Sequence, residues 1–351
     1  MQLTYRFRLR DTVDSELTRQ ARAVNLVWNF ANETQQQAVK RGRKWLSWHD
    51  LQKLTAGSSK ELDLHSHTIQ QVCQRYSHSR EAKNKPWLRW RVSNPNSPKR
   101  SLGWVPFNNG HVVYRGGAFV FRGRPYRAWV SRELAEGQTF GAGSFSQDAQ
   151  GRWYINLPVQ VQHRDCGTKA VGVDLGLKDL ATLSTGEKIT HPAYYRAMES
   201  RLATAQRARK KCRARKLHAK IKAQRADHLH KLSTRLVHEN GAIFVGNVNA
   251  AGLAKTKMAK SVLDAGWSML RTQLEYKAIR HRAVFAEVDE RFTTQACSQC
   301  GSIEGPKGLS GLGIREWHCS CGAPHDRDTN AAQNILATGL SSLAGGAYHG
   351  G

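Results

Sequence analysis

The chain has 351 residues, 40% of them hydrophobic, and its 54 lysines and arginines against 27 aspartates and glutamates give a formal net charge of +27. So large a positive excess opposes compact folding unless a polyanion neutralises it, which makes nucleic acid the leading partner and an acidic membrane surface the rival. No run of about 18 apolar residues is present to span a bilayer, and MQLTYRFRLR lacks the apolar core of a secretion signal, so neither membrane insertion nor secretion is expected.

The first half of the chain predicts a strand, then helices, then a β-rich segment. QLTYRFRL alternates as a strand does, residues 14–94 turn helical, and SHTIQQVCQRYSHSREA is a second helix. VSNPNSPKRSLG has the composition of a linker. From Trp104 to Val161, the segments HVVYRGGAFVFRG, RAWVSREL and RWYINLPVQV predict a small barrel or curled sheet. The apolar residues expected to form the core face of the first helix are Leu17, Ala21, Val24, Leu26, Val27, Phe30 and Ala31.

The second half predicts an α/β order with a mixed sheet. AVGVDLGLKDLATLSTGEKI begins as an apolar strand and continues as a hairpin, and residues 192–238 form one long helical stretch with room for a turn. A short strand, Ala242–Val245, comes next. A helix over Ala259–Ala283, the strand AVFAEVDE and a last helix in DTNAAQNILATGL complete the order.

Four of the seven cysteines form two close pairs, Cys297-x₂-Cys300 and Cys319-x-Cys321. Two thiolate pairs, each followed by a glycine, suit one structural zinc ion, and the Gly-rich segment between them needs a metal to hold its fold. The second pair is one residue short of the usual spacing, so His318 is an alternative ligand, and four free buried cysteines are the alternative to a metal site. The three scattered cysteines are interpreted as structural or incidental: Cys73, Cys166 and Cys212.

Carboxylates stand at the end of one strand and at the start of the last helix. Two Mg²⁺ ions at a phosphodiester need acids that converge from different elements. Asp174 ends the strand of VGVDLG, where beginning a β-turn is its other role. Asp326 and Asp328 open the helix of HDRDTNAAQNIL, where capping is the alternative. We favour Asp328 because small residues, Ala331 and Ala332, follow it and allow close approach to the sheet.

Taken together, these residues resemble TnpB, the RNA-guided endonuclease family of insertion sequences, which is related to the type V CRISPR effectors. GVDLGLKDLATLSTGEKI is similar to the family's first RuvC-like nuclease motif, and AKIKAQRADHLHKLSTRLV is similar to the basic helix before the second. TTQACSQCG and WHCSCGAPHDRDTNAAQNIL are similar to its zinc insert and third motif. The resemblance covers nearly the whole chain.

The resemblance implies a multidomain fold, α+β and then α/β. A β-barrel wedge domain (1–12 and 95–165) with a helical recognition insert (13–94) is expected first. An RNase H/RuvC-like nuclease domain (166–292 and 323–343) follows, with a zinc-binding target-nucleic-acid insert (293–322) and a disordered tail (344–351).

The second motif is where this chain departs from the family. The family usually carries a Glu-Asp pair after that strand, and here the aligned residues are Gly246 and Asn247. Glu290 ends the next strand, where alternation places it on the same face as Ala286 and Val288. Some relatives resemble this arrangement, with an alternative glutamate in place of the lost acid. Glu290 is therefore expected to join Asp174 and Asp328 as a catalytic Mg²⁺ ligand; the alternatives are Glu287, Asp289, or a surface acid without a role.

The expected function is that of a transposon-encoded, Mg²⁺-dependent RNA-guided DNA endonuclease. The resemblance implies an omega or right-end guide RNA and a double-stranded DNA target with an adjacent motif as partners, no membrane, a monomer or dimer, and a prokaryotic cytoplasm near the nucleoid. Two Mg²⁺ ions would be catalytic and one Zn²⁺, held by Cys297, Cys300, Cys319 and Cys321, structural. A nuclease-dead RNA-guided repressor is the main alternative, and an RNA-free DNA-binding protein is the third.

Basic segments would contact the nucleic acid. Arg201 to His238 holds 13 lysines and arginines against one acid, Asp227. KPWLRWR interleaves Trp87 and Trp90 with arginines, which suits either base stacking or a domain core. Contacts are also expected in the helical region, from Arg19, Arg22, Arg75, Arg80 and Lys83.

Overall fold

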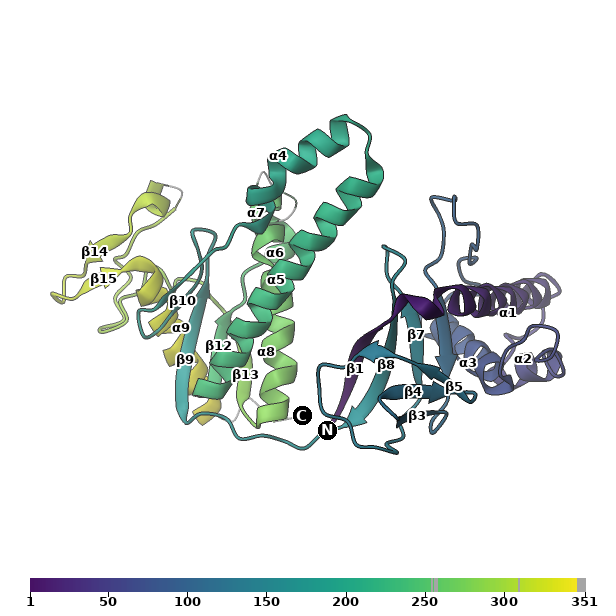
Figure 1. Ribbon diagram of the computed structural model, residues 1–351. Coiled ribbons are helices and arrows are strands. Elements are labelled where there is room, and N and C mark those ends of the chain that lie inside the picture. The colour runs from purple at the N-terminus through teal and green to yellow at the C-terminus, as the bar shows by residue number, and fades with distance from the viewer. Residues whose placement is uncertain (254, 256–257, 309, 346–351) are drawn as a thin grey trace. The chain divides into compact units, whose positions relative to one another are not determined.

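The computed structural model describes residues 1–253, 255, 258–308 and 310–345 (Figure 1). The chain divides into two compact units, Met1–Val161 and Gln162–Gly351. Within the described residues, no helix has the length and apolar character that crossing a membrane requires. The predicted start of the disordered tail, residue 344, was too early, because Ala344 still belongs to the last helix. Residues 346–351 lie outside the described part of the chain.

A five-stranded antiparallel sheet in the order β2-β7-β8-β1-β6 is the frame of the first unit. β1 pairs with β8 from Gln2↔Gln160 to Arg8↔Tyr154, and the buried residues alternate along both strands. β3, β4 and β5 form a second sheet. The bounds are β1 Gln2–Leu9, β2 Trp104–Phe107, β3 Val112–Arg115, β4 Ala118–Phe121, β5 Arg124–Tyr126, β6 Ala128–Trp129, β7 Gly143–Gln147 and β8 Trp153–Gln160.

This part of the chain follows the β pattern of the sequence with two differences. Of RAWVSREL only Ala128–Trp129 is strand, and β7 was not predicted because GSFSQ is weakly apolar. That this part of the chain forms a wedge domain with a helical recognition insert stays a prediction.

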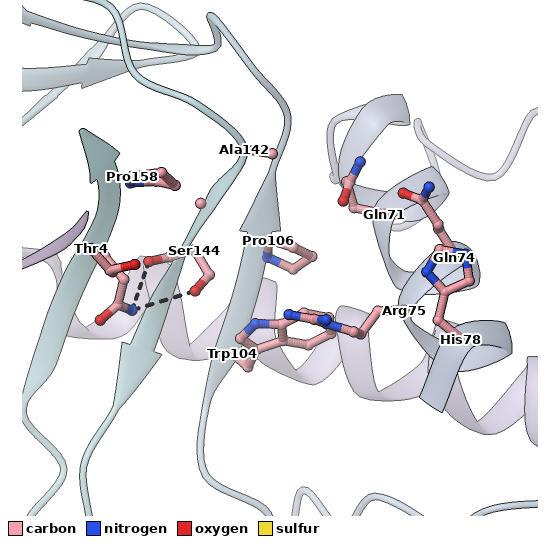
Figure 2. Close-up of a pocket in the computed structure, with 12 residues that line it drawn as sticks. Thr4, Gln71, Gln74, Arg75, His78, Trp104, Pro106, Ala142, Ser144 and Pro158 are labelled. Atoms are coloured by element: carbon pink, nitrogen blue, oxygen red, sulfur yellow. Dashed lines mark hydrogen bonds between the residues drawn. The ribbon is translucent and has the colours of Figure 1, made fainter. Parts of the chain in front are cut away.

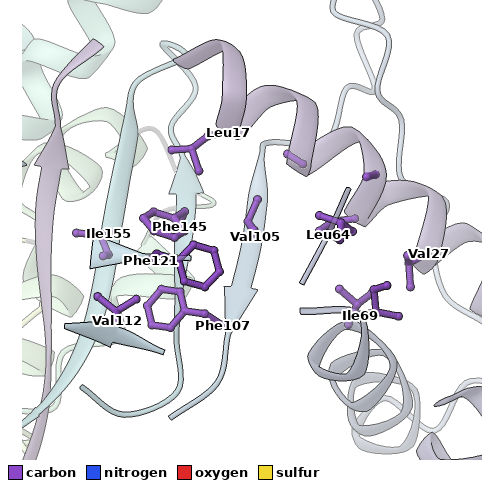
Figure 3. Close-up of a cluster of buried hydrophobic side chains, with 14 of the residues drawn as sticks. Leu17, Val27, Leu64, Ile69, Val105, Phe107, Val112, Phe121, Phe145 and Ile155 are labelled. Atoms are coloured by element: carbon purple, nitrogen blue, oxygen red, sulfur yellow. The ribbon is translucent and has the colours of Figure 1, made fainter. Parts of the chain in front are cut away.

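The helices of the first unit share one hydrophobic core with its strands (Figure 3). They are the short 3₁₀ turn η1 (Asp11–Val13), α1 (Asp14–Lys40), α2 (Trp48–Leu54) and α3 (Ser66–Ala82), and all three α-helices lie within residues 14–94, the range predicted to be helical. Leu17 and Ile69 enter this core with Phe121 and Phe145 of the strands.

The predicted core face of α1 was too wide. Leu26 is 60% and Phe30 44% exposed, whereas Val24 and Ala31 are fully buried. Leu26 follows Val24 by two residues, about 200° around the helix, so it falls on the opposite face.

The second unit is a mixed sheet with helices on both faces. Its strand order is β11-β10-β9-β12-β13, and β9, β12 and β13 run parallel while β10 and β11 complete an antiparallel hairpin edge. The strand bounds are β9 Lys169–Leu175, β10 Asp179–Leu183, β11 Lys188–Thr190, β12 Asn240–Gly246 and β13 Val284–Val288.

Helices α5 and α8 cover one face of this sheet and α9 covers the other (Figure 1). The predicted helix over Ala259–Ala283 is in fact two, because Gly266 has φ +71° and ends α7. The bounds are α4 Tyr194–Arg207, α5 Lys211–Glu239, α6 Ala250–Leu253, α7 Ala259–Ala265, α8 Trp267–His281 and α9 Arg327–Ala344. Between β13 and α9 lie the short η2 (Ser310–Gly313) and the hairpin of β14 (Glu316–His318) and β15 (Pro324–Asp326).

Helix α9 lies unusually close to the sheet, because glycines remove the side chains between them. A Cβ at Gly172 of β9 would stand 2.1 Å from the backbone oxygen of Ala332, and one at Gly339 of α9 would stand 2.2 Å from the ring of Phe244. This close contact holds the start of α9 beside the end of β9.

Gly172→Ala tests this packing. The added methyl meets rigid backbone, so we expect the second unit to lose about 1–3 kcal/mol of its free energy of unfolding, measured by urea denaturation. Gly313→Ala is the control, because a Cβ there meets nothing within 4 Å. Equal losses in the two variants would contradict the close contact.

Candidate active site and zinc cluster

Asp174 lies at the carboxyl end of β9, on the face of the sheet that α9 covers. Val173 and Leu175 on either side of it point into the core beneath α5 and α8, so strand alternation turns Asp174 the other way. Burial raises the pKa of Asp174 to about 8, and the negative charges of Asp328 and Glu290 add to the effect. A carboxyl group whose pKa is raised this far by burial and by neighbouring acids is a candidate for a functional site.

Asp328 stands in the first turn of α9 and is held by two arginines. Arg315 Nη1 lies 2.7 Å from Asp328 Oδ2, and Arg327 Nε lies 3.1 Å from Asp328 Oδ1. Asp326, the second choice of the sequence analysis, is instead the N-cap. Its Oδ1 accepts the backbone N–H of Thr329 at 2.9 Å, and its Oδ2 pairs with Lys188 Nζ at 2.6 Å.

Glu290 lies two residues beyond β13, and its side chain turns toward β12. β12 and β13 are paired so that Gly246 is opposite Val288. A Cβ placed on Gly246 would be 2.9 Å from Glu290 Oε2 and 3.5 Å from Glu290 Cβ. The Glu290 side chain therefore occupies the space that a residue-246 side chain would fill. Burial raises the pKa of Glu290 as well.

Asn247 fixes this arrangement from the neighbouring strand. Its backbone N–H donates to Val288 O at 2.9 Å, and its side-chain Oδ1 accepts the backbone N–H of Glu290 at 3.3 Å. Gly246 and Asn247 thus both accommodate Glu290, Gly246 by leaving space and Asn247 by a hydrogen bond.

Asp174, Glu290 and Asp328 line one cavity of about 490 Å³. Among the described residues, the carboxylate oxygens of these three acids do not all lie within 4.8 Å of one another, so the acids share the cavity without forming one closely spaced ligand group. Arg315 and Arg327 add positive charge to the wall. The sequence analysis missed both arginines, although Arg327 lies inside the HDRD motif.

The two acids closest to Glu290 in sequence point elsewhere, whereas Asp179 of β10 also lines the cavity. Glu287 pairs with Arg271 at 2.8 Å, and Asp289 pairs with Arg291 at 2.6 Å. Each is 45% exposed, and neither is among the residues that line the cavity.

The four clustered cysteines come together as their spacing predicted. All four Sγ atoms lie within 4.8 Å of one another, with Cys297 and Cys321 3.8 Å apart and Cys300 and Cys319 3.6 Å apart. Tetrahedral thiolates at about 2.3 Å from zinc are separated by about 3.8 Å, so this set fits the ion.

The turns of the cluster also suit thiolates. Gly301 and Gly322, which follow the two pairs, have φ +80° and +89°. Hydrogen bonds from Ser302 lower the pKa of Cys300 to about 6. The histidine nearest the sulfurs is not the exposed His318 but the buried His325, whose Nε2 lies 3.0 Å from Cys297 Sγ.

The basic surface of the second unit is concentrated on the first half of α5 and the turn before it. Only the second half of α5 packs on the sheet, through Leu229, Leu232 and Leu236. The exposed cations of the first half form no ion pair with any residue that the structure describes: Arg207, Arg209, Lys210, Lys211, Arg213, Arg215, Lys216, Lys220 and Lys222.

One predicted nucleic-acid contact in the first unit was wrong. Arg80 is 1% exposed and donates to Leu46 O and Gln35 Oε1, because it ties α3 to the segment before α2. Arg22, Arg75 and Lys83 are exposed, whereas Arg19 pairs with Asp63. Trp87 and Trp90 are 40% and 42% exposed, which excludes the core alternative for both.

A polar cavity of about 360 Å³ also lies in the first unit, between α3 and the five-stranded sheet (Figure 2). Gln71, Gln74 and Arg75 reach it from the helix, and Trp104 and Ser144 from the strands. Amide, guanidinium and indole groups in one hollow suit nucleotide contacts.

The comparisons with known proteins agree with this architecture. Residues 155–257 match the family described as “Probable transposase” (OrfB_IS605), and residues 267–335 match “Cas12f1-like, TNB domain”. The solved structure titled “Cryo-EM structure of the Cas12f1-sgRNA-target DNA complex” superposes with a TM-score of 0.58 at 10% identity, over 93% of this chain and 83% of that one, which shows a shared fold.

Curated relatives show the family. A Streptomyces pristinaespiralis protein named “Putative RNA-guided DNA endonuclease” is 34% identical over 97% of this chain and 90% of its own length. The Escherichia coli “Putative RNA-guided DNA endonuclease InsQ” is 28% identical over 56% of each chain. The fold is of mixed α/β architecture, and the family models and relatives make this a transposon-associated protein. The chain belongs to the TnpB family, and the resemblance stated from its motifs is confirmed.

Cys319→Ser tests the zinc cluster. We expect the bound zinc of this cluster to be lost, because three ligands leave the Gly-rich segment without its metal, and proteolysis within residues 297–321 to accelerate about tenfold or more. Metal analysis and limited proteolysis measure the two effects. Cys212→Ser, at an exposed cysteine of α5, is the control and should change neither.

The raised pKa of Asp174 predicts how stability depends on pH without added Mg²⁺. Between its ordinary value of 3.8 and about 8, the folded chain keeps a proton that the unfolded chain has released. The free energy of unfolding should therefore fall as the pH rises through this window, by up to about 1.4 kcal/mol per pH unit.

Asp174→Asn should remove this dependence, as followed by urea denaturation at pH 5, 6, 7 and 8. Asp165→Asn, at an exposed aspartate of the same unit, controls for the lost charge. A wild-type slope that survives in Asp174→Asn would contradict the assignment.

Proposed function

We propose that this chain is an RNA-guided DNA endonuclease encoded by a mobile element, and that it hydrolyses phosphodiester bonds at the cavity of Asp174, Glu290 and Asp328. The name of the Streptomyces relative, similar over almost its full length, supports the activity. The three carboxylates that line one cavity from β9, the segment after β13 and the start of α9 support the location.

One observation carries the proposal that the site is active: the Glu290 carboxylate fills the space beside Gly246. Loss of the usual acid of the second motif would by itself predict a dead nuclease. Here the neighbouring strand supplies a carboxylate at 2.9 Å from where that side chain would begin. A larger residue at 246 would collide with Glu290, so the glycine and the glutamate belong to one arrangement.

The chemistry divides between the ions and the chain. Asp174, Glu290 and Asp328 would hold two Mg²⁺ ions, which would supply a nucleophilic water and positive charge at the leaving 3′ oxygen. Asp174 must give up its proton to act as a ligand, and Glu290 completes the carboxylate set. Arg315 and Arg327 orient Asp328 and bring positive charge toward the phosphate. The four cysteines would hold a structural zinc ion beside this site.

The partners proposed are a guide RNA and a DNA target. The unpaired cations of α5 would follow the phosphate backbone, while base pairing with the guide reads the sequence. The polar cavity of Figure 2, with Arg75 and Trp104, would contact nucleic acid in the first unit.

A guided DNA-binding repressor without nuclease activity is the second candidate, and Gly246-Asn247 is the observation that favours it. The two candidates share every binding surface and differ only in whether Glu290 completes a working metal site. Cleavage therefore distinguishes them, and binding does not.

Glu290→Gln decides between them. With the co-expressed guide RNA and Mg²⁺, we expect plasmid cleavage to fall by about 100-fold or more while target binding persists, because a neutral amide cannot replace a carboxylate ligand. Asp289→Asn is the matched control, since this adjacent acid is paired with Arg291 and should leave cleavage unchanged.

The double variant Gly246→Glu, Glu290→Ala should recover part of the cleavage, because it returns a carboxylate to the same space from the other strand. Undiminished cleavage by Glu290→Gln would place the third ligand elsewhere. A wild-type protein that binds its target and never cuts would establish the repressor.

A further inference from the structure

Three histidines of the first unit converge at a place that the proposed nuclease function does not use. His65 and His67 stand at the start of α3, and His111 directly precedes β3. One ring nitrogen from each lies within 4.8 Å of those of the other two. His67 Nδ1 and His111 Nε2 are 2.8 Å apart, and the ring centroids are separated by 4.6 to 5.1 Å.

The rings of His65 and His67 are held in place by the buried start of α3. Leu64, just before them, is 3% exposed and belongs to the core shown in Figure 3. Thr68, just after them, donates its hydroxyl to Pro106 O at 2.9 Å, which fastens the helix to β2. His65 itself caps the helix, since its Nδ1 accepts the backbone N–H of His67 at 3.2 Å.

The ring of His111 is held by a turn that lies more than 40 residues after His67 in sequence. Gly110, with φ +74°, donates its backbone N–H to Phe140 O at 2.9 Å, and the His111 N–H returns to Asn108 O at 3.3 Å. The rings therefore meet because two anchored segments meet, and not because they are neighbours on one flexible loop.

The surroundings keep these rings in the form that binds metals. Burial lowers the pKa of His65 and of His111, and the neighbouring histidines lower both further. A neutral imidazole has a free lone pair that suits zinc, copper or nickel, whereas Mg²⁺ and Ca²⁺ prefer oxygen ligands. Asp63, the acid two residues before His65, is already engaged by Arg19 and Arg122.

We propose that His65, His67 and His111 bind a divalent transition-metal ion, zinc in the first place, with a water molecule in the fourth position. The ion would fasten the start of α3 to the loop between β2 and β3. Three imidazoles at about 2.0–2.1 Å from zinc stand about 3.4 Å apart, so His67 and His111 need to separate by only a few tenths of an ångström.

Metal binding by these three neutral histidines requires only that protons move between the nitrogens of each ring, and none is released to solvent. In the metal-free structure one proton lies between His67 Nδ1 and His111 Nε2, and binding moves it to the outer nitrogen of the same ring. His65 loses its cap bond whichever nitrogen binds. If Nδ1 is the ligand its lone pair goes to the metal, and if Nε2 is the ligand the proton moves to Nδ1. The alternative is a hydrogen-bonded histidine trio that holds no ion.

Zinc content per chain tests the proposal. The full chain, purified without a histidine tag, is equilibrated with buffered free Zn²⁺, passed through a desalting column and analysed for bound metal. We expect two zinc ions in the wild type, one at the cysteines and one at the histidines. His67→Ala and His65→Asn should each retain one, and asparagine keeps the helix cap at residue 65. His49→Ala, at an exposed histidine, should keep two.

A second measurement separates this site from the cysteine cluster and guards against misfolding. In the double variant Cys319→Ser, Cys321→Ser, Co²⁺ should bind at one site per chain and give a visible spectrum without the thiolate-to-cobalt charge-transfer band. Adding His111→Ala should abolish that spectrum. A wild type with a single zinc that His67→Ala retains, or a cysteine variant that binds no Co²⁺, would overturn the proposal. Neither outcome bears on Glu290 or on cleavage.

Discussion

The parallel pairing of β9, β12 and β13 is the constraint on which the candidate site depends. Parallel strands bring their carboxyl ends to one edge of the sheet, so residues that follow them meet there even when they are more than 100 positions apart in sequence. Asp174 ends β9, and Glu290 follows β13. β12 lies between these strands and ends in Gly246, so the space above its end is open to a side chain from its neighbour.

The opposite wall of the cavity depends on how closely α9 approaches this sheet. Gly172 and Gly339 have no side chain to hold the helix away, and Ala331 and Ala332 are fully buried in the contact. The first turn of α9 therefore brings Asp328 to the strand ends, while Asp326, two residues earlier, caps the same helix. The same backbone packing thus positions one acid in the cavity and removes another.

Charge is distributed so that the basic surface and the acidic cavity are separate. The long α5 packs on the sheet through its second half and carries exposed cations along its first half. Around the cavity, by contrast, positive charge comes from Lys178 and from Arg315 and Arg327, the two arginines that hold Asp328. A surface that attracts a polyanion and a cavity that attracts cations are what a metal-dependent reaction on nucleic acid requires.

Sequence alone determined the local features, because each of them depends on residues close together in the chain. Alternation gave β1, β9 and the common face of Ala286, Val288 and Glu290, and the paired cysteines gave the cluster. Tertiary structure decided what depends on distant neighbours: that Arg80 is buried, that Asp326 caps rather than lines the cavity, and that Gly266 divides a helix. It also brought His111 to His65 and His67, which no spacing in the sequence indicates. Above all, only the structure showed that Glu290 fills the space of Gly246, because the two residues are 44 positions apart and meet through strand pairing.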